Sequence, residues 1–140
     1  AEATGGRLYL LSGRRPPAIE EPLSRDVDLG ELGRVRVTPW EGGAIADDPC
    51  VQAMSARAVE GAVFRTRKPG DFIVPLGMTG RQKLSDYFIN RHVDRPLREL
   101  VPLLARGGEV LWAAGIGLSE TAKLRSGEKA LRFEYIEKSL

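Results

Sequence analysis

The chain consists largely of short apolar segments in β-type patterns, separated by turns that contain glycine and proline. In residues 34–38 charged and apolar side chains alternate, which places Val35 and Val37 on one face of a strand. Lys68-Pro69-Gly70-Asp71 ends another such segment, because proline fixes φ and glycine accepts a positive φ. Several short strands with one or two helices predict an α+β or mainly β fold. We expect strands over residues 7–11, 34–38, 62–67, 72–74, 109–114 and 130–136.

One segment has a helical pattern. Leu84, Tyr87 and Phe88 follow the i, i+3, i+4 spacing of an apolar stripe that packs against a core. Thr79 and Gln82 fit a capping box, in which Thr79 is the N-cap and Gln82 the third helical residue. The sequence therefore predicts a main helix that begins at Thr79.

The main helix is expected to end near Asn90, a residue that tolerates a C-terminal cap. A second, short helix is expected over residues 94–100. Asp94 would be its N-cap, and Pro96 would occupy its first turn, where a missing N–H costs nothing.

Length and composition favour one soluble domain. The chain has 140 residues, of which 42% are hydrophobic and 29% charged, and no apolar run approaches the 18 residues of a membrane span. We expect a single domain over residues 7–140, preceded by a linker over residues 1–6. A single cysteine excludes an internal disulfide and favours a cytoplasmic setting.

The sequence contains no convincing catalytic or metal-binding set. Cys50 and His92 are the only possible Cys–His pair, and one of each is too few for a zinc or copper centre. Cys50 is better explained as a small, half-buried residue, and His92 lies among arginines. The Gly-Ile-Gly of residues 115–117 lacks the third glycine of a dinucleotide loop, and no Walker A motif occurs. We therefore assign no catalytic residue, metal ligand or cofactor to this chain.

Charge is distributed unevenly along the chain. The whole sequence carries a net charge of +2, but residues 1–64 carry −3 and residues 65–98 carry +5. Such a concentration of cations is expected of a polyanion contact, although a merely solvated surface would also explain it. The eight cations of this block are Arg65, Arg67, Lys68, Arg81, Lys83, Arg91, Arg95 and Arg98.

A series of motifs runs through and beyond this block in a specific order. The principal ones are Arg-Thr-Arg-Lys-Pro-Gly-Asp at 65–71, Pro-Leu-Gly-Met at 75–78, Lys-Leu-Ser-Asp-Tyr-Phe-Ile at 83–89, Gly-Glu-Val-Leu-Trp at 108–112 and Leu-Ser-Glu at 118–120. In this order they resemble the C-terminal domain of bacterial tRNA(Ile)-lysidine synthetases. The family-like core covers residues 62–136, whereas the match before Ala62 is poor.

The resemblance implies both a fold and a function. The fold would be a small β-sandwich-like core with helices, similar to a small domain of the phenylalanyl-tRNA synthetase β chain. The parent enzyme would use ATP, with magnesium, to attach lysine to the wobble cytidine of an isoleucine tRNA, and its nucleotide site would lie in an N-terminal catalytic domain. The C-terminal domain would contact the acceptor-stem side of the tRNA. Phe72 and Asn90 depart from the family pattern, which often has a basic and an acidic residue there.

The resemblance and the charge pattern agree on the same block. Duplex RNA is recognised through its shape, phosphates and 2′-hydroxyls, which requires cations on a rigid surface. We expect Arg65 and Arg67 to share a strand face, and Arg81 and Lys83 to lie at the positive N-terminal end of the main helix. The alternative is an interaction module that packs on the catalytic domain or on a second copy of the chain, with the basic block merely solvated.

Overall fold

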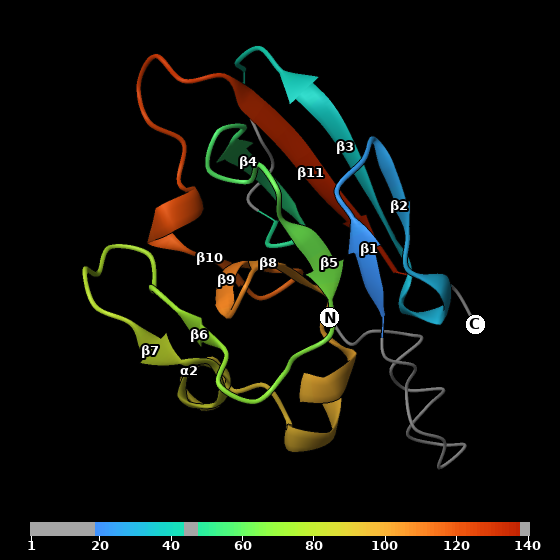
Figure 1. The fold of residues 1–140 in the computed structure, drawn as a ribbon, viewed down its shortest axis with the longest axis vertical. Coiled ribbons are helices and arrows are strands. Elements are labelled where there is room, and N and C mark those ends of the chain that lie inside the picture. Colours follow the sequence, from blue (N-terminus) through green and yellow to red (C-terminus); the bar gives the residue numbers. More distant parts are fainter. Residues whose placement is uncertain (1–18, 44–47, 138–140) are drawn as a thin grey trace.

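The computed structural model describes residues 19–43 and 48–137. Two of the expected segments, the linker at 1–6 and the strand at 7–11, lie outside these residues. The described part forms two β-sheets with one short α-helix and three 3-10 helices (Figure 1). This arrangement confirms the α+β, mainly β expectation.

The smaller sheet has four antiparallel strands in the order β2-β3-β11-β4. These strands are β2 (Asp26–Asp28), β3 (Arg34–Trp40), β4 (Val51–Ser55) and β11 (Ala130–Ile136). β11 lies between β3 and β4, and Phe133 is opposite Val37 of β3. The alternation expected for β3 is confirmed, because Val35 and Val37 are buried while Arg34 and Arg36 are exposed.

The larger sheet has the strand order β1-β5-β8-β9-β6-β7, with β10 also paired to β9. Its strands are β1 (Glu20–Pro22), β5 (Val63–Arg65), β6 (Phe72–Ile73), β7 (Gln82–Lys83), β8 (Leu103–Arg106), β9 (Glu109–Ala113) and β10 (Gly117–Leu118). β6 runs parallel to β9, and the other pairs are antiparallel. This parallel pairing places β6 and β7 beside the β8–β9 hairpin.

The helices are short. They are η1 (Gly30–Leu32), α2 (Leu84–Asn90), η2 (Arg95–Leu100) and η3 (Glu120–Ala122). In Figure 1, α2, β6 and β7 lie at the opposite end of the molecule from the upper ends of β3 and β11.

The main core lies between the two sheets. Phe64 and Trp112 of the larger sheet meet Phe133 of the smaller one, with ring centroids 5.8 to 6.4 Å apart. All three side chains are fully buried. A second apolar cluster joins α2 to the larger sheet, where Leu84 and Phe88 pack with buried residues of β6 and β9. The predicted apolar stripe of the helix is thereby confirmed.

The predicted start of the helix is wrong. α2 begins at Leu84, its N-cap residue is Lys83, and no side chain caps it. Gln82 and Lys83 instead form β7 and pair with Ile73 and Phe72. A capping box is a local pattern, and here strand pairing with a segment about ten residues earlier prevails over it. The end of the helix at Asn90 is confirmed.

The second predicted helix exists in a tighter form. η2 is a 3-10 helix with Pro96 in its first turn, and Asp94 occupies the N-cap position without a side-chain hydrogen bond. Six strands of the described residues were not anticipated: β1, β2, β4, β7, β8 and β10. β8 illustrates the reason, because Leu103, Leu104 and Ala105 are all buried and a strand covered on both faces lacks the alternating pattern.

The revised helix start leads to a prediction about stability. Thr79→Ala should change the free energy of unfolding by less than about 0.5 kcal/mol, because Thr79 is exposed and lies before β7. Ser119→Ala provides the contrast, since Ser119 is buried, accepts a hydrogen bond from the Thr121 N–H and donates one to the Val74 carbonyl. It should cost about 1–2 kcal/mol. Urea denaturation of both variants measures the difference. A loss of about 1 kcal/mol in the free energy of unfolding of Thr79→Ala would show that Thr79 does cap the helix.

Candidate nucleic-acid interface

A groove of about 620 Å³ brings together part of the basic block. It lies between the loop that joins β5 to β6, the first residues of α2 and one residue of η2. Its lining residues are Arg67, Lys68, Pro69, Gly70, Asp71, Phe72, Lys83, Leu84, Ser85 and Glu99. We call this surface the basic groove.

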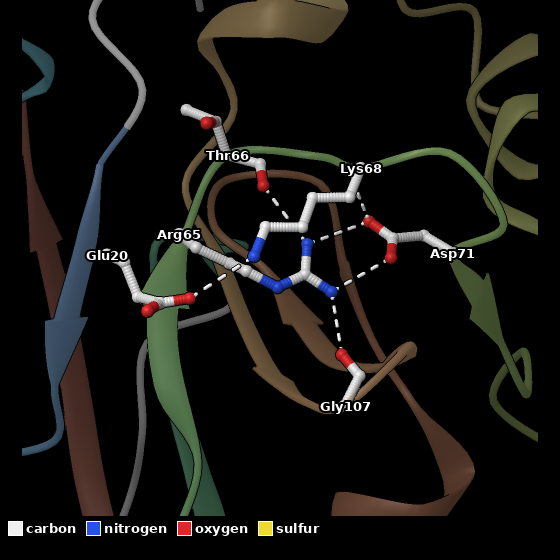
Figure 2. A network of polar contacts seen from close by, with 6 residues as sticks. All are labelled: Glu20, Arg65, Thr66, Lys68, Asp71 and Gly107. Carbon is white, nitrogen blue, oxygen red and sulfur yellow. Dashed lines mark hydrogen bonds and ion pairs between the residues drawn. The ribbon is translucent and has the colours of Figure 1, made fainter.

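The loop on one side of the basic groove is held by a buried ion pair (Figure 2). Both terminal nitrogens of Arg65 donate hydrogen bonds to the carboxylate of Asp71, and each bond is 2.8 Å long. Both side chains are only 3% exposed. The Arg65 guanidinium also donates to the carbonyls of Thr66 and Gly107. Asp71 accepts a further bond from the Lys68 backbone N–H. Arg65 thus joins both ends of the 66–71 loop to the β8–β9 turn.

The structure corrects the expected position of Arg65. Arg65 is the last residue of β5 and points into the protein, whereas Arg67 lies beyond the strand with 28% of its side chain exposed. The two arginines therefore do not share an exposed strand face. A buried guanidinium whose terminal nitrogens make four internal hydrogen bonds is not a surface cation, so Arg65 supports the loop that lines the basic groove.

Two cations of the loop are paired with carboxylates from distant segments. Arg67 forms an ion pair with Glu99 of η2: its Nε donates a hydrogen bond to Oε1 at 2.7 Å, and its Nη2 lies 2.6 Å from the same oxygen. Lys68 contacts Glu20 of β1 at 3.3 Å, and both of these side chains are about 60% exposed. Neither pair is buried, so both cations remain accessible to an anion in solvent.

Lys83 and Arg81 lie on the other side of the basic groove. Lys83 lines it as the N-cap residue of α2, and among the described residues it has no ion pair. The guanidinium of Arg81 lies over the ring of Phe72, 4.3 Å from its centroid. Because α2 begins at Leu84 and has only seven residues, the expected contribution of a helix N-terminus at Arg81 is wrong.

The remaining three predicted cations lie outside the lining of the basic groove. Arg91 donates from Nε to the Tyr87 hydroxyl at 3.2 Å and borders a second hollow of about 390 Å³. Arg98 donates from Nε to the Val93 carbonyl at 2.9 Å. Arg95 is exposed at the start of η2. The structure thus gathers Arg67, Lys68 and Lys83, with Arg81 adjacent through Phe72, and leaves the other three apart.

Sequence analysis missed the two carboxylates that contact these cations. Glu99 follows Arg67 by 32 residues, and Glu20 precedes Lys68 by 48, so no local motif joins either pair. Only the spatial meeting of β1, the loop and η2 reveals these pairs.

The surroundings of Cys50 do not activate its thiol. Cys50 is half-buried, and burial together with nearby Asp48 raises the pKa of its thiol. A raised pKa favours the thiol over the nucleophilic thiolate at neutral pH. Within residues 19–43 and 48–137, no three His, Cys, Asp or Glu residues are grouped so as to hold a metal ion. In the same residues no helix is long and apolar enough to cross a membrane.

The fold and the groove define a small two-sheet domain that presents clustered cations on one surface. The family model for the TilS substrate C-terminal domain matches residues 63–135, and the chain belongs to this family. It is thus related to the C-terminal domain of tRNA(Ile)-lysidine synthase, which confirms the resemblance deduced from the motifs.

Individual relatives agree with this assignment. The tRNA(Ile)-lysidine synthase of Geobacter sulfurreducens is 44% identical over 69 residues, which are 49% of this chain and 15% of that protein. The enzyme of Caldanaerobacter subterraneus subsp. tengcongensis is 39% identical over 74 residues, 52% of this chain and 16% of that protein. The match therefore spans about one sixth of the length of these relatives.

A solved structure shares the fold. The crystal structure of a TilS C-terminal domain superimposes with a TM-score of 0.74 and 20% sequence identity, covering 89% of this chain and all of that one. The expected similarity to the phenylalanyl-tRNA synthetase β chain stays a prediction, as do the domain boundaries.

Proposed function

We propose that this chain is the tRNA-binding C-terminal domain of a tRNA(Ile)-lysidine synthase. Its relatives carry that name, and the observation that supports RNA binding is the basic groove, where Arg67, Lys68 and Lys83 meet beside a loop held in place by Arg65. Such a groove suits phosphates, because arginine binds them through two nitrogens and lysine as a point charge.

The parent enzyme would ligate lysine to the wobble cytidine of an isoleucine tRNA in the cytoplasm. ATP and magnesium would bind to its N-terminal catalytic domain, which would be a partner of this domain within the same protein. The role of this domain would be to hold the acceptor-stem side of the tRNA. Phosphates are spaced alike in every duplex RNA, so the domain would bind different tRNAs with similar affinity, and discrimination would come from the anticodon end.

Only some of the eight cations expected from the sequence would contact RNA within the basic groove. Arg67, Lys68 and Lys83 would contact phosphates directly, and Arg81 would extend the same surface past Phe72. Arg91, Arg95 and Arg98 would contact a second part of a long ligand, since they lie outside the basic groove. Arg65 would act only by fixing the loop.

Replacing Arg67 and Lys68 by alanine tests the RNA-binding role. Each lost phosphate contact reduces the number of counterions released on binding, so the plot of log affinity against log salt should flatten by up to about two. Binding should weaken by a similar factor for several tRNAs. Fluorescence anisotropy across a salt series measures both quantities.

The matched control replaces Arg34 and Arg36 by alanine. Both are exposed on β3 of the other sheet, so the net charge changes equally while the basic groove stays intact. Its salt dependence should resemble that of the unaltered chain. If this control loses binding while the Arg67/Lys68 variant retains its full salt dependence, the RNA face lies on the smaller sheet.

The alternative function, an interaction module, is favoured by one specific observation. Leu76 and Met78, in the loop between β6 and β7, are each 53% exposed. Packing on a catalytic domain or on a second copy would cover such side chains. Dimerisation that increases with protein concentration in sedimentation experiments, together with no detectable tRNA binding, would support this alternative.

A further inference from the structure

Two cations of the basic groove, Arg67 and Lys68, already form ion pairs with carboxylates of this chain. Glu99 accepts a hydrogen bond from Nε of Arg67, and the same carboxylate oxygen forms an ion pair with Nη2 at 2.6 Å. These two nitrogens form one of the two edges through which a guanidinium can bind a phosphate. Glu99 itself lines the groove. A phosphate that approaches this edge therefore meets a carboxylate already in the place it would take.

Glu99 is suited to being displaced. Half of its side chain is exposed, and an ion pair of this exposure contributes little to the stability of the fold. The 66–71 loop does not depend on Glu99 for its shape, since the buried pair of Arg65 and Asp71 holds it. Arg67 can thus exchange Glu99 for a phosphate while the loop keeps its conformation.

We infer that Glu99 is an affinity-limiting residue of the basic groove that competes with RNA phosphates for Arg67. This inference rests on the proposed function. Its consequence is that binding through the groove stays weak and reversible, so that contacts which cannot distinguish one tRNA from another do not dominate recognition.

Displacing Glu99 has two measurable effects. The free carboxylate lies near the incoming phosphate, and like charges about 4 Å apart in water weaken binding by about fivefold. The carboxylate also takes up a cation from solution when Arg67 leaves it, which cancels part of the counterion release that accompanies phosphate binding. Glu99 should therefore lower both the affinity and its dependence on salt.

The experiment compares the full chain with its Glu99→Gln variant, using a short RNA duplex as the probe. The variant should bind about fivefold more tightly at low salt. Its plot of log affinity against log salt should be steeper by up to about one. In an Arg67→Ala background, Glu99→Gln should have little further effect, because the residue acts through Arg67.

Asp26→Asn is the matched control. Asp26 is 49% exposed and forms an ion pair with Arg34 on the other sheet, so its loss changes the net charge by the same amount without freeing a groove cation. If Glu99→Gln binds no more tightly than Asp26→Asn, or gains equally without Arg67, the inference is wrong while the proposed function stands. RNA binding that is absent or insensitive to salt in the unaltered chain would overturn both.

Discussion

Asp71→Ala should lower the free energy of unfolding by about 3–5 kcal/mol. Removing this carboxylate leaves Arg65, only 3% exposed, with an uncompensated charge inside the protein. It also removes the acceptor of the Lys68 backbone N–H. A charge in a poorly solvated position is far more costly than the lost attraction between two solvated groups, which explains the size of the effect. Chemical denaturation followed by tryptophan fluorescence measures the change.

Asp26→Asn is the control for the effect of burial on the stability loss expected for Asp71→Ala, because it breaks an exposed ion pair. The Arg34–Asp26 pair has the same closest distance of 2.8 Å but is about half exposed at both ends. Its loss should cost less than about 1 kcal/mol. Equal costs at Asp71 and Asp26 would mean that solvent reaches Arg65 and that the loop is not held as described.

Phe88→Ala should also cost about 3–5 kcal/mol. The Phe88 ring is fully buried in the cluster that attaches α2 to the larger sheet. Truncation removes its burial and leaves a cavity that a seven-residue helix can only partly close. Since Lys83, Leu84 and Ser85 line the basic groove, loosening α2 should also disturb the groove.

Ile89→Ala is the control on the same helix. Ile89 follows Phe88 directly but is 54% exposed, so the substitution should change stability by no more than about 0.5 kcal/mol. Thermal unfolding of the two variants compares an inward and an outward position with nearly the same helix propensity. Similar melting temperatures for both would show that α2 is not anchored by its apolar stripe.

The strands that were anticipated have patterns contained within a few residues. β3 and β11 alternate clearly, and as neighbours in the smaller sheet they bury Val35, Val37, Phe133 and Tyr135 in the same core. β8 is buried on both faces and β1 is three exposed residues, so neither has an alternating pattern to detect. The start of α2 shows the limit in another way, since pairing of Gln82 and Lys83 with β6 replaced the local capping pattern.

In the candidate site, too, some features follow from local sequence and others from contacts between distant segments. The sequence by itself determined the apolar stripe of α2, the turn at 68–71, the concentration of cations and the family, because each is carried by neighbouring residues or by an ordered series of motifs. Only the tertiary structure decided that Arg65 is internal, that Arg67 meets Glu99 and that Lys68 meets Glu20. The physical reason is that charge is a property of a residue, whereas its burial and its partners depend on which distant segments the fold brings together.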